Sequence, residues 1–185
     1  MFIETETTPN PATLKFLPGR VVMEQGTANF ADAEAATRSP LASRLFTLGG
    51  VTQVFFGADF ISVSKDDDTA WQQLKPAVLG AIMDHFTSGQ ALLTRNEAPV
   101  PEADGAEGED GEVVSQIKEL LETRVRPAVA QDGGDIVFEA YADGIVYLQM
   151  HGSCSGCPSS TATLKAGIEN MLRHYIPEVV EVRAV

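Results

Sequence analysis

The chain of 185 residues has only two cysteines, and this scarcity excludes several classes of protein. Two thiols in this length do not form the disulfide framework of a secreted protein. No run of apolar residues approaches the roughly 18 that span a bilayer, the densest being AVLGAIM. The opening MFIETETTPN has no Lys, Arg or apolar core, so it predicts neither a secretory signal nor an Arg-rich transit peptide. These absences favour the cytosol, where paired thiols are typical of metal or redox sites.

Basic residues are also scarce, with 13 Lys and Arg against 26 Asp and Glu and a net charge of −13. Residues 1–95 (7 bases, 10 acids) and 113–185 (6 bases, 9 acids) each carry −3, so residues 96–112 carry −7. No basic patch is present, which excludes nucleic acid as a partner. Residues 96–112 contain two Pro, three Gly and no aromatic residue, a composition that predicts an acidic, disordered linker.

Strand and helix signals alternate before this linker and predict a mixed α/β domain over residues 1–95. Ser39 is the expected cap of a short helix with Pro40 at its first position. Pro76 lies early in the longest expected helix, where it kinks the helix or moves its start. The expected elements are strands at 2–6, 13–17, 51–56 and 60–65, and helices at 39–50 and 68–89.

Residues 113–185 predict a smaller domain in the order α-β-β-α-β. A β-α-β crossover places its last strand parallel to the strand before the cysteines. The expected elements are helices at 113–131 and 158–175 and strands at 135–141, 145–151 and 179–185, with ADG as a hairpin turn. The fold class is therefore α+β, with two small α/β-type domains (1–95 and 113–185) joined by the acidic linker 96–112.

The stretch HGSCSGCPSSTATLKAGI, residues 151–168, holds both thiols between a strand and a helix. Pro158 suits the first helical position, and the free N–H groups and dipole of that helix favour thiolate at Cys154 and Cys157. Gly152 and Gly156 permit a tight turn. Hydroxyl donors are expected from Ser159, Ser160 and Thr161. The arrangement favours a thiolate-bound metal cluster of negative charge.

Several alternatives remain open from the residues alone. The pair fits a thioredoxin-like redox site by geometry, although the domain is short for that fold and Ser153 stands where an aromatic residue is usual. Zinc and iron–sulfur clusters each want four ligands. His151 is interpreted as a solvated strand end, and the other histidines, His85 and His174, lie far along helices. A cluster would therefore join two chains, and an exposed bridging cluster suits a carrier better than an enzyme.

The segment from GGDIVFEAY to RHYIPEV closely resembles the C-terminal domain of the NifU-like, or Nfu, iron–sulfur proteins, over residues 113–185. The first domain, with TETTPNPATLKFLPG and VFFGADFISVSK, is similar to the N-terminal domain of the longer Nfu proteins. The resemblance implies a scaffold or carrier that holds one [4Fe–4S] cluster per homodimer and passes it to apo-proteins. Cys154 and Cys157 fall on that family's cluster ligands.

Further expectations follow from this resemblance. The partners would be apo iron–sulfur client proteins and upstream cluster-assembly proteins, with no nucleic acid, no membrane and no enzyme activity. Residues 1–95 lack cysteine, so we expect them to recognise client or assembly proteins rather than hold a second cluster. The targeting extension of mitochondrial relatives is absent from the start of this sequence, which predicts a bacterial cytosolic protein. Thiol–disulfide exchange by the same two cysteines is the alternative function.

Overall fold

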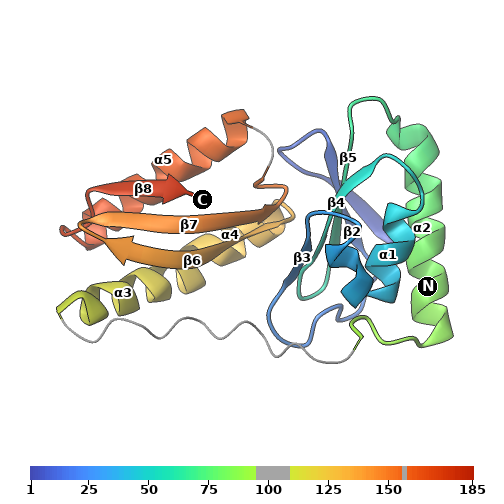
Figure 1. Ribbon diagram of the computed structural model, residues 1–185, viewed down its shortest axis with the longest axis horizontal. Helices are drawn as coiled ribbons and strands as arrows, with labels where there is room; N and C mark the ends of the chain where they lie inside the picture. Colours follow the sequence, from blue (N-terminus) through green and yellow to red (C-terminus); the bar gives the residue numbers. More distant parts are fainter. Residues whose placement is uncertain (95–108, 156–157) are drawn as a thin grey trace. The chain divides into compact units, whose positions relative to one another are not determined.

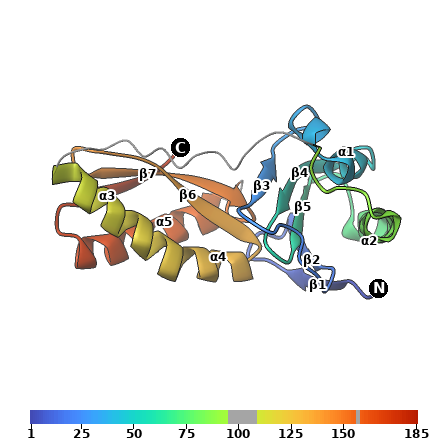
Figure 2. The same cartoon turned by 90° about the horizontal axis from the view of Figure 1, so that it is seen from below.

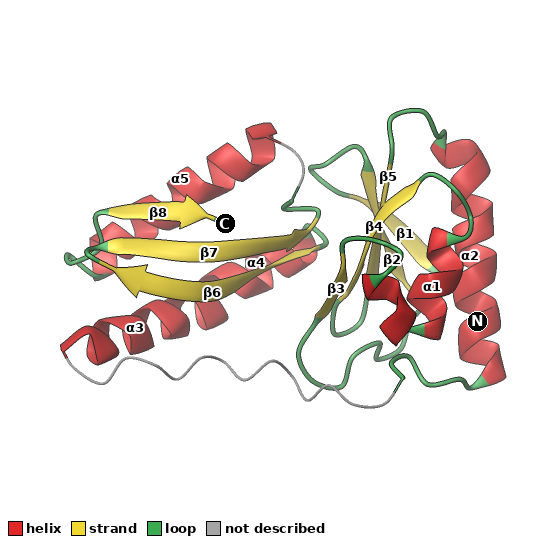
Figure 3. Ribbon diagram, in the orientation of Figure 1, coloured by secondary structure: helices red, strands yellow, loops and turns green. Residues whose placement is uncertain are grey.

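The computed structural model describes residues 1–94, 109–155 and 158–185 (Figure 1). The chain divides into two compact units, Met1–Pro99 (unit 1) and Val100–Val185 (unit 2). Both combine helices with a β-sheet, as Figure 3 shows. The predicted α+β fold class is therefore confirmed. No helix in the described ranges has the length and apolar character needed to cross a membrane.

Unit 1 is a five-stranded antiparallel sheet in the order β1-β2-β5-β4-β3, with two α-helices on one face (Figure 1). The predicted strands and helices of this unit are present. Its elements are β1 (Glu4–Thr7), β2 (Thr13–Leu17), β3 (Ala28–Phe30), η1 (Ala35–Arg38), α1 (Pro40–Phe46), β4 (Val51–Phe56), β5 (Ile61–Lys65) and α2 (Trp71–Ser88).

Local signals in the sequence explain where the helices of unit 1 begin and end. Ser39 has extended backbone and its hydroxyl accepts a hydrogen bond from the Ala42 N–H at 3.2 Å, which caps α1 as predicted. α2 runs through Pro76 and ends at Gly89, whose φ of 67° is left-handed. Leu74, Val78, Ile82 and neighbouring apolar residues of α1 and the sheet form the buried core.

The sequence did not predict the short strand β3 or the 3₁₀ turn η1. Three residues are too few to show an alternating pattern, and β3 is fixed by tertiary packing instead. The ring of Phe30 meets that of Phe56 edge to face, with centroids 5.0 Å apart. In the ladder between β3 and β4, Phe30 lies opposite Val54 and Ala28 lies opposite Phe56.

Unit 2 has a three-stranded sheet in the order β6-β7-β8, with its helices on one side (Figure 2). β6 and β7 are antiparallel, and β7 and β8 are parallel, as predicted. The hairpin turns at Asp143 and Gly144, both with positive φ (51° and 79°). The elements are α3 (Glu109–Leu120), η2 (Leu121–Val125), α4 (Arg126–Gln131), β6 (Gly134–Ala142), β7 (Ile145–Gly152), α5 (Pro158–Tyr175) and β8 (Glu181–Ala184).

The first helix of unit 2 differs from the prediction in two respects. It begins at Glu109 rather than 113, so the last four residues of the predicted linker are helical. Acidic residues suit a first helical turn because they complement the helix dipole. A π-helical segment, η2, also interrupts it before α4. The remaining part of the predicted linker, 96–108, lies outside the described residues.

Aliphatic side chains from the helices and the sheet form the core of unit 2. They alternate along the strands, so that one face of the sheet packs against the helices. The most deeply buried are Ile117, Ile136, Val146, Leu148, Leu172, Ile176 and Val182. This packing fixes the end of β7 and the start of α5, and the predicted site lies between them.

Candidate metal centre

Cys154 lies in the turn that joins β7 to α5, in the strand–turn–helix arrangement that the sequence predicts. We call Gly152–Ser155 the cysteine turn. Gly152 has a φ of 65°, a left-handed conformation that favours glycine. The second predicted ligand, Cys157, lies outside the described residues.

The backbone of the cysteine turn is hydrogen-bonded to neighbouring elements on both sides of Cys154. The Ser153 N–H donates to the Gly133 carbonyl at 3.2 Å, and the Ser153 hydroxyl donates to the Asp132 carbonyl. From α5, the Thr161 hydroxyl donates to the Cys154 carbonyl at 2.9 Å. The thiol is therefore presented from a fixed backbone, because anchors before and after Cys154 hold it in place.

The expected role of the hydroxyls near the helix start is only partly matched. Thr161 was expected to add a hydroxyl donor at the helix start, and its hydroxyl donates to the Cys154 carbonyl oxygen rather than to the thiol. Ser159 has an exposed side chain. The side chain of Ser160 lies outside the described residues. Thr161 therefore links α5 to the cysteine turn.

Gly134, at the start of β6, makes room for the thiol of Cys154. A Cβ added at Gly134 would lie 2.5 Å from Cys154 Sγ and 2.8 Å from the His151 carbonyl oxygen. Both distances are shorter than any tolerated contact, so residue 134 must lack a side chain for this arrangement. The sequence alone indicates only that a helix ends before this glycine. The signal it missed is the cross-strand register that sets Gly134 opposite Gly152.

The thiol of Cys154 is a free, buried group, with 5% of the residue exposed. The pKa of Cys154 is raised to about 11, chiefly by burial; a hydrogen bond with Ser153 lowers it, and the charges of Asp132 and Asp135 contribute to the rise. The expectation of a thiolate stabilised by the helix start is therefore wrong for Cys154 in the metal-free chain. Desolvation is the largest cause of the raised pKa at this position.

A buried ion pair lies beside Gly134 and ties α4 to β6. Arg126 Nε and Nη2 donate to the two carboxylate oxygens of Asp135 at 2.9 and 3.0 Å, and Arg126 Nη1 bonds Glu122 at 2.7 Å. The Asp135 side chain is 5% exposed and also accepts the Ile136 N–H. The hydrogen bond to Asp135 is the main cause that raises the pKa of Arg126. Sequence reasoning missed this pair because its partners are nine residues apart across a turn.

His151 is partly buried rather than a solvated strand end, so that interpretation is corrected. It lies opposite Asp135 in the β6–β7 register. Burial lowers the pKa of His151, and the Asp135 charge opposes this effect. Within the described residues, no group of three or more His, Cys, Asp or Glu side chains is placed to hold a metal ion. Cys154 thus has the donor chemistry for a soft metal without a complete ligand set around it.

The acidic run at 66–68, which resembles a calcium loop only superficially, has a structural role. The Asp66 carboxylate accepts the Thr69 N–H at 2.8 Å just before α2. A hydrogen bond with the Thr69 side chain is the main cause that lowers the pKa of Asp66, and the Thr69 backbone N–H lowers it further.

Two family models match the chain, one on each unit. The model described as "Scaffold protein Nfu/NifU N terminal" matches residues 3–89. The model described as "NifU-like domain" matches residues 117–183, which include the cysteine turn. The predicted resemblance is therefore confirmed for both parts of the chain.

Curated relatives match the chain along its whole length. The chain is 54% identical over 186 residues to "NFU1 iron-sulfur cluster scaffold homolog, mitochondrial" of Homo sapiens, covering all of this chain and 72% of the relative. It is 51% identical over 181 residues to "NifU-like protein 4, mitochondrial" of Arabidopsis thaliana, covering 97% of this chain and 64% of the relative. An NMR structure of a NifU-like protein from Saccharomyces cerevisiae aligns with a TM-score of 0.47 and 24% identity, over 52% of this chain and 87% of that one.

These relatives correct the predicted location. The prediction of a bacterial cytosolic protein rested on the residues with which this sequence starts. The plant and human relatives are mitochondrial proteins, and the chain spans only 64% to 72% of their lengths. The bacterial cytosolic assignment is therefore wrong. The two family models and the identity with full-length relatives show that the chain belongs to the NifU-like (Nfu) family.

Proposed function

We propose that the chain carries an iron–sulfur cluster as cargo, binds it as [4Fe–4S] through Cys154 and Cys157, and passes it to apo-proteins. Membership of the Nfu family supports this role, as does the name of the human relative, an iron–sulfur cluster scaffold. The anchored thiol of Cys154 at the junction of β7 and α5 provides a soft ligand of the kind that iron–sulfur clusters take.

The incomplete ligand set is the observation on which the proposal depends. A [4Fe–4S] cluster takes four thiolates, and the whole chain has two cysteines. No third His, Cys, Asp or Glu joins Cys154 in a metal-binding group within the described ranges. Two chains that each supply Cys154 and Cys157 would complete the set, so the loaded form is a homodimer around one cluster.

The environment of Cys154 implies that a proton is released when the cluster binds and is taken up again when the cluster leaves. The thiol is protonated in the metal-free chain because burial raises its pKa to about 11. Only the thiolate binds metal, so loading must displace this proton to solvent. Unloading returns it, and the buried neutral thiol is then the favoured state. This gives the empty carrier a stable form and makes release of the cargo less unfavourable.

A carrier accounts for the site better than an enzyme of thiol–disulfide exchange. Such an enzyme needs a thiolate nucleophile at neutral pH, and the raised pKa of Cys154 opposes this. An insulin-reduction assay with the metal-free chain tests the alternative. We expect no turnover above the uncatalysed rate, whereas rapid reduction would favour the redox function.

Anaerobic reconstitution with iron and sulfide tests the ligands. The full chain should become brown and hold about four irons per dimer. Replacing either thiol, in Cys154→Ser or Cys157→Ser, should abolish the colour, because the remaining ligands cannot complete the set. Ser88→Ala in unit 1 is a control that leaves loading unchanged. Colour that survives both single cysteine changes would refute the assignment.

We further propose that unit 1 recognises client or assembly proteins. Its sequence has no cysteine, and its fold is a closed domain with a core of its own. Deleting residues 1–94 should leave cluster binding intact and slow transfer to apo-proteins. Loss of cluster binding in the deletion variant would assign unit 1 a structural role instead.

A further inference from the structure

The edge of the sheet in unit 1 offers a surface for a partner. β1 pairs with β2 on one side, and no other strand in the described part of the chain lies along its second edge. The backbone groups of such an edge are a template on which an extended peptide can add a strand. β1 is therefore a candidate for recognition through main-chain hydrogen bonds.

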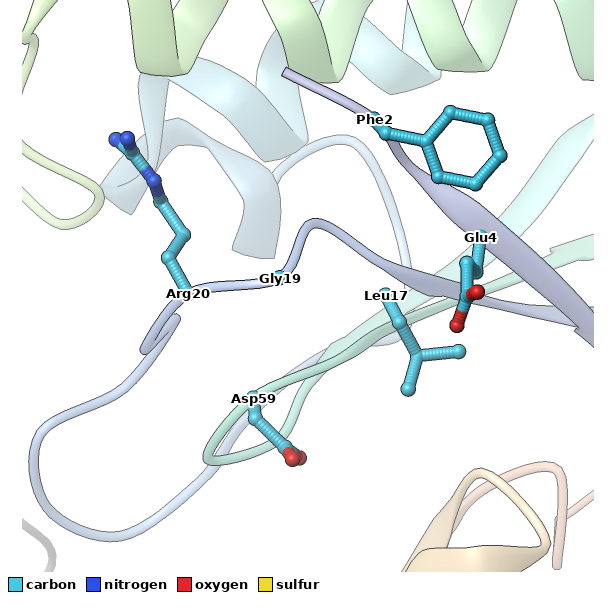
Figure 4. A pocket seen from close by; sticks show the side chains of 6 residues that line it. All are labelled: Phe2, Glu4, Leu17, Gly19, Arg20 and Asp59. Atoms are coloured by element: carbon cyan, nitrogen blue, oxygen red, sulfur yellow. The ribbon is translucent and has the colours of Figure 1, made fainter.

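A pocket opens at the amino end of β1, on the same sheet edge. Its volume is about 510 Å³. Figure 4 shows Phe2, Glu4 and Leu17 on one wall, with Arg20 and Asp59 across from them. Phe2 is 80% exposed, and Val21, in the adjoining loop, is 62% exposed. An apolar side chain from a partner would cover Phe2, which water now surrounds.

Alternation along β1 places Glu4 and Glu6 on one face of the strand, and Phe2, which precedes the strand, lines the same pocket as Glu4. Glu4 lies opposite Leu17, and Glu6 lies opposite Lys15. Lys15 Nζ is 3.3 Å from Glu6 Oε2, so the negative charge of Glu6 is largely neutralised by an ion pair within the unit. Glu4 is the carboxylate of this face that lies nearest the pocket and lines its wall.

The charges at the pocket favour a cationic partner. Neither Glu4 nor Asp59 has an ion-pair partner among the residues that the structure describes. The one cation on the pocket wall, Arg20, has its guanidinium carbon 5.4 Å from the centre of the Phe86 ring on α2. A basic side chain on an added strand would face Glu4 as an opposite-charge cross-strand pair.

We propose that β1 binds an extended segment of a partner protein as an added strand, with a Lys or Arg facing Glu4 and an apolar side chain in the pocket beside Phe2. This proposal rests on the recognition role proposed for unit 1 and gives that role a surface and a ligand chemistry. The expected pattern on one face of the segment is an apolar and a basic residue at alternate positions, matching Phe2 and Glu4, with no charge needed opposite Glu6, which Lys15 already pairs.

Two peptides test the proposal, because the added strand can run in either direction. Acetyl-TTTKTLT-amide matches an antiparallel strand, and acetyl-TLTKTTT-amide matches a parallel one. Each is titrated into the full chain labelled with ¹⁵N. We expect one of them to give saturable amide shifts at residues 2–7 and slower hydrogen exchange along β1. Binding should weaken about tenfold in Phe2→Ala and about tenfold in Glu4→Lys.

Controls separate strand addition from attraction between a cationic peptide and a chain of net charge −13. A peptide with alternate N-methylated amides keeps its charge but loses ladder hydrogen bonds, so it should not bind. Met83→Ala, an exposed residue on α2, should bind like the parent chain.

The proposal is overturned if neither peptide binds, if the N-methylated peptide binds equally well, or if Glu4→Lys has no effect. In that case the acidic edge serves only to prevent aggregation. Iron loading is measured on the same samples, because it depends on unit 2. Failed peptide binding with normal loading counts against this surface alone and leaves cluster carriage intact.

Discussion

Unit 1 contains a five-stranded sheet, one histidine and no cysteine, whereas the three-stranded unit 2 holds both cysteines of the chain. Their polar contacts also differ. In unit 1 the ion pair Arg44–Asp84 is exposed on both sides, while in unit 2 Arg126 and Asp135 are joined by two hydrogen bonds with Asp135 buried.

The difference teaches how a small unit holds a reactive side chain in place. Unit 1 fixes its elements with a large apolar core rich in aromatic rings. Unit 2 adds polar anchors around the cysteine turn, from the Asp132 and Gly133 carbonyls and the Thr161 hydroxyl. We infer that the anchors exist for the thiol, and that removing them affects unit 2 and its cargo while leaving unit 1 unchanged.

The two units can be followed separately. Trp71, the single tryptophan, lies at the start of α2 in unit 1. All three tyrosines lie in unit 2, at 141, 147 and 175. Trp fluorescence and Tyr absorbance during urea unfolding therefore report the units individually.

The largest expected effect comes from breaking the buried ion pair. Arg126→Leu leaves the Asp135 carboxylate buried without its partner and should destabilise unit 2 by about 3 kcal/mol. Arg44→Ala breaks the exposed pair of unit 1 and should cost less than about 1 kcal/mol. Equal losses in the two variants, measured by urea unfolding, would remove the distinction between the units.

Gly134→Ala tests whether residue 134 must lack a side chain to leave room for the thiol of Cys154. The added Cβ would lie 2.5 Å from Cys154 Sγ, so unit 2 should lose about 2 kcal/mol and bind iron poorly. Gly167→Ala on α5 is a matched control, because nothing lies within 4 Å of its added Cβ. That change should stabilise the helix by about 1 kcal/mol. If Gly134→Ala is tolerated as well as Gly167→Ala, the packing of the thiol against β6 is wrong.

Thr161→Val removes the hydroxyl that binds the Cys154 carbonyl while keeping the shape of the side chain. The expected loss is about 1 kcal/mol in unit 2, with faster release of bound iron to a chelator. Thr161→Ser keeps the donor and should restore the release rate of the parent chain. Identical release from the two variants would show that this anchor does not position the cysteine turn.

The smallest effect is a pH dependence of unit 1. Burial lowers the pKa of His85 below 6.5, and Nε2 of this side chain has no hydrogen-bond partner in the described residues. The unfolded chain therefore binds more protons below pH 6.5, and the stability of unit 1 should fall as the pH drops through that value. His85→Leu should remove the contribution of His85 to this loss of stability at low pH, measured by Trp71 fluorescence during urea unfolding. An unchanged pH profile would exclude His85 as its cause.

Much of the fold could be predicted where local chemistry decides it. Pro158 and Pro177 bound α5, whose ends were predicted correctly, and Asp143 and Gly144 identified the hairpin turn. β3 and the π-helical segment η2 were missed, because tertiary packing rather than a sequence pattern sets them.

The position of the candidate site in the fold could be predicted from the sequence, but the burial and the pKa of its thiol could not. Residue spacing placed Cys154 between β7 and α5, and the structure agrees. Its raised pKa could not be predicted, because the burial and the charges of Asp132 and Asp135 come from a turn some twenty residues away in the sequence. The same long-range pairing explains why the need for Gly134 was missed.

Native mass spectrometry under anaerobic conditions tests the central claim most directly, because it counts chains, iron and sulfide in one species. We predict that the loaded form contains two chains and one [4Fe–4S] cluster. When a chelator removes the cluster, this cluster-bridged dimer should disappear from the spectrum. A single chain that retains an intact [4Fe–4S] cluster without an added thiol would contradict the account.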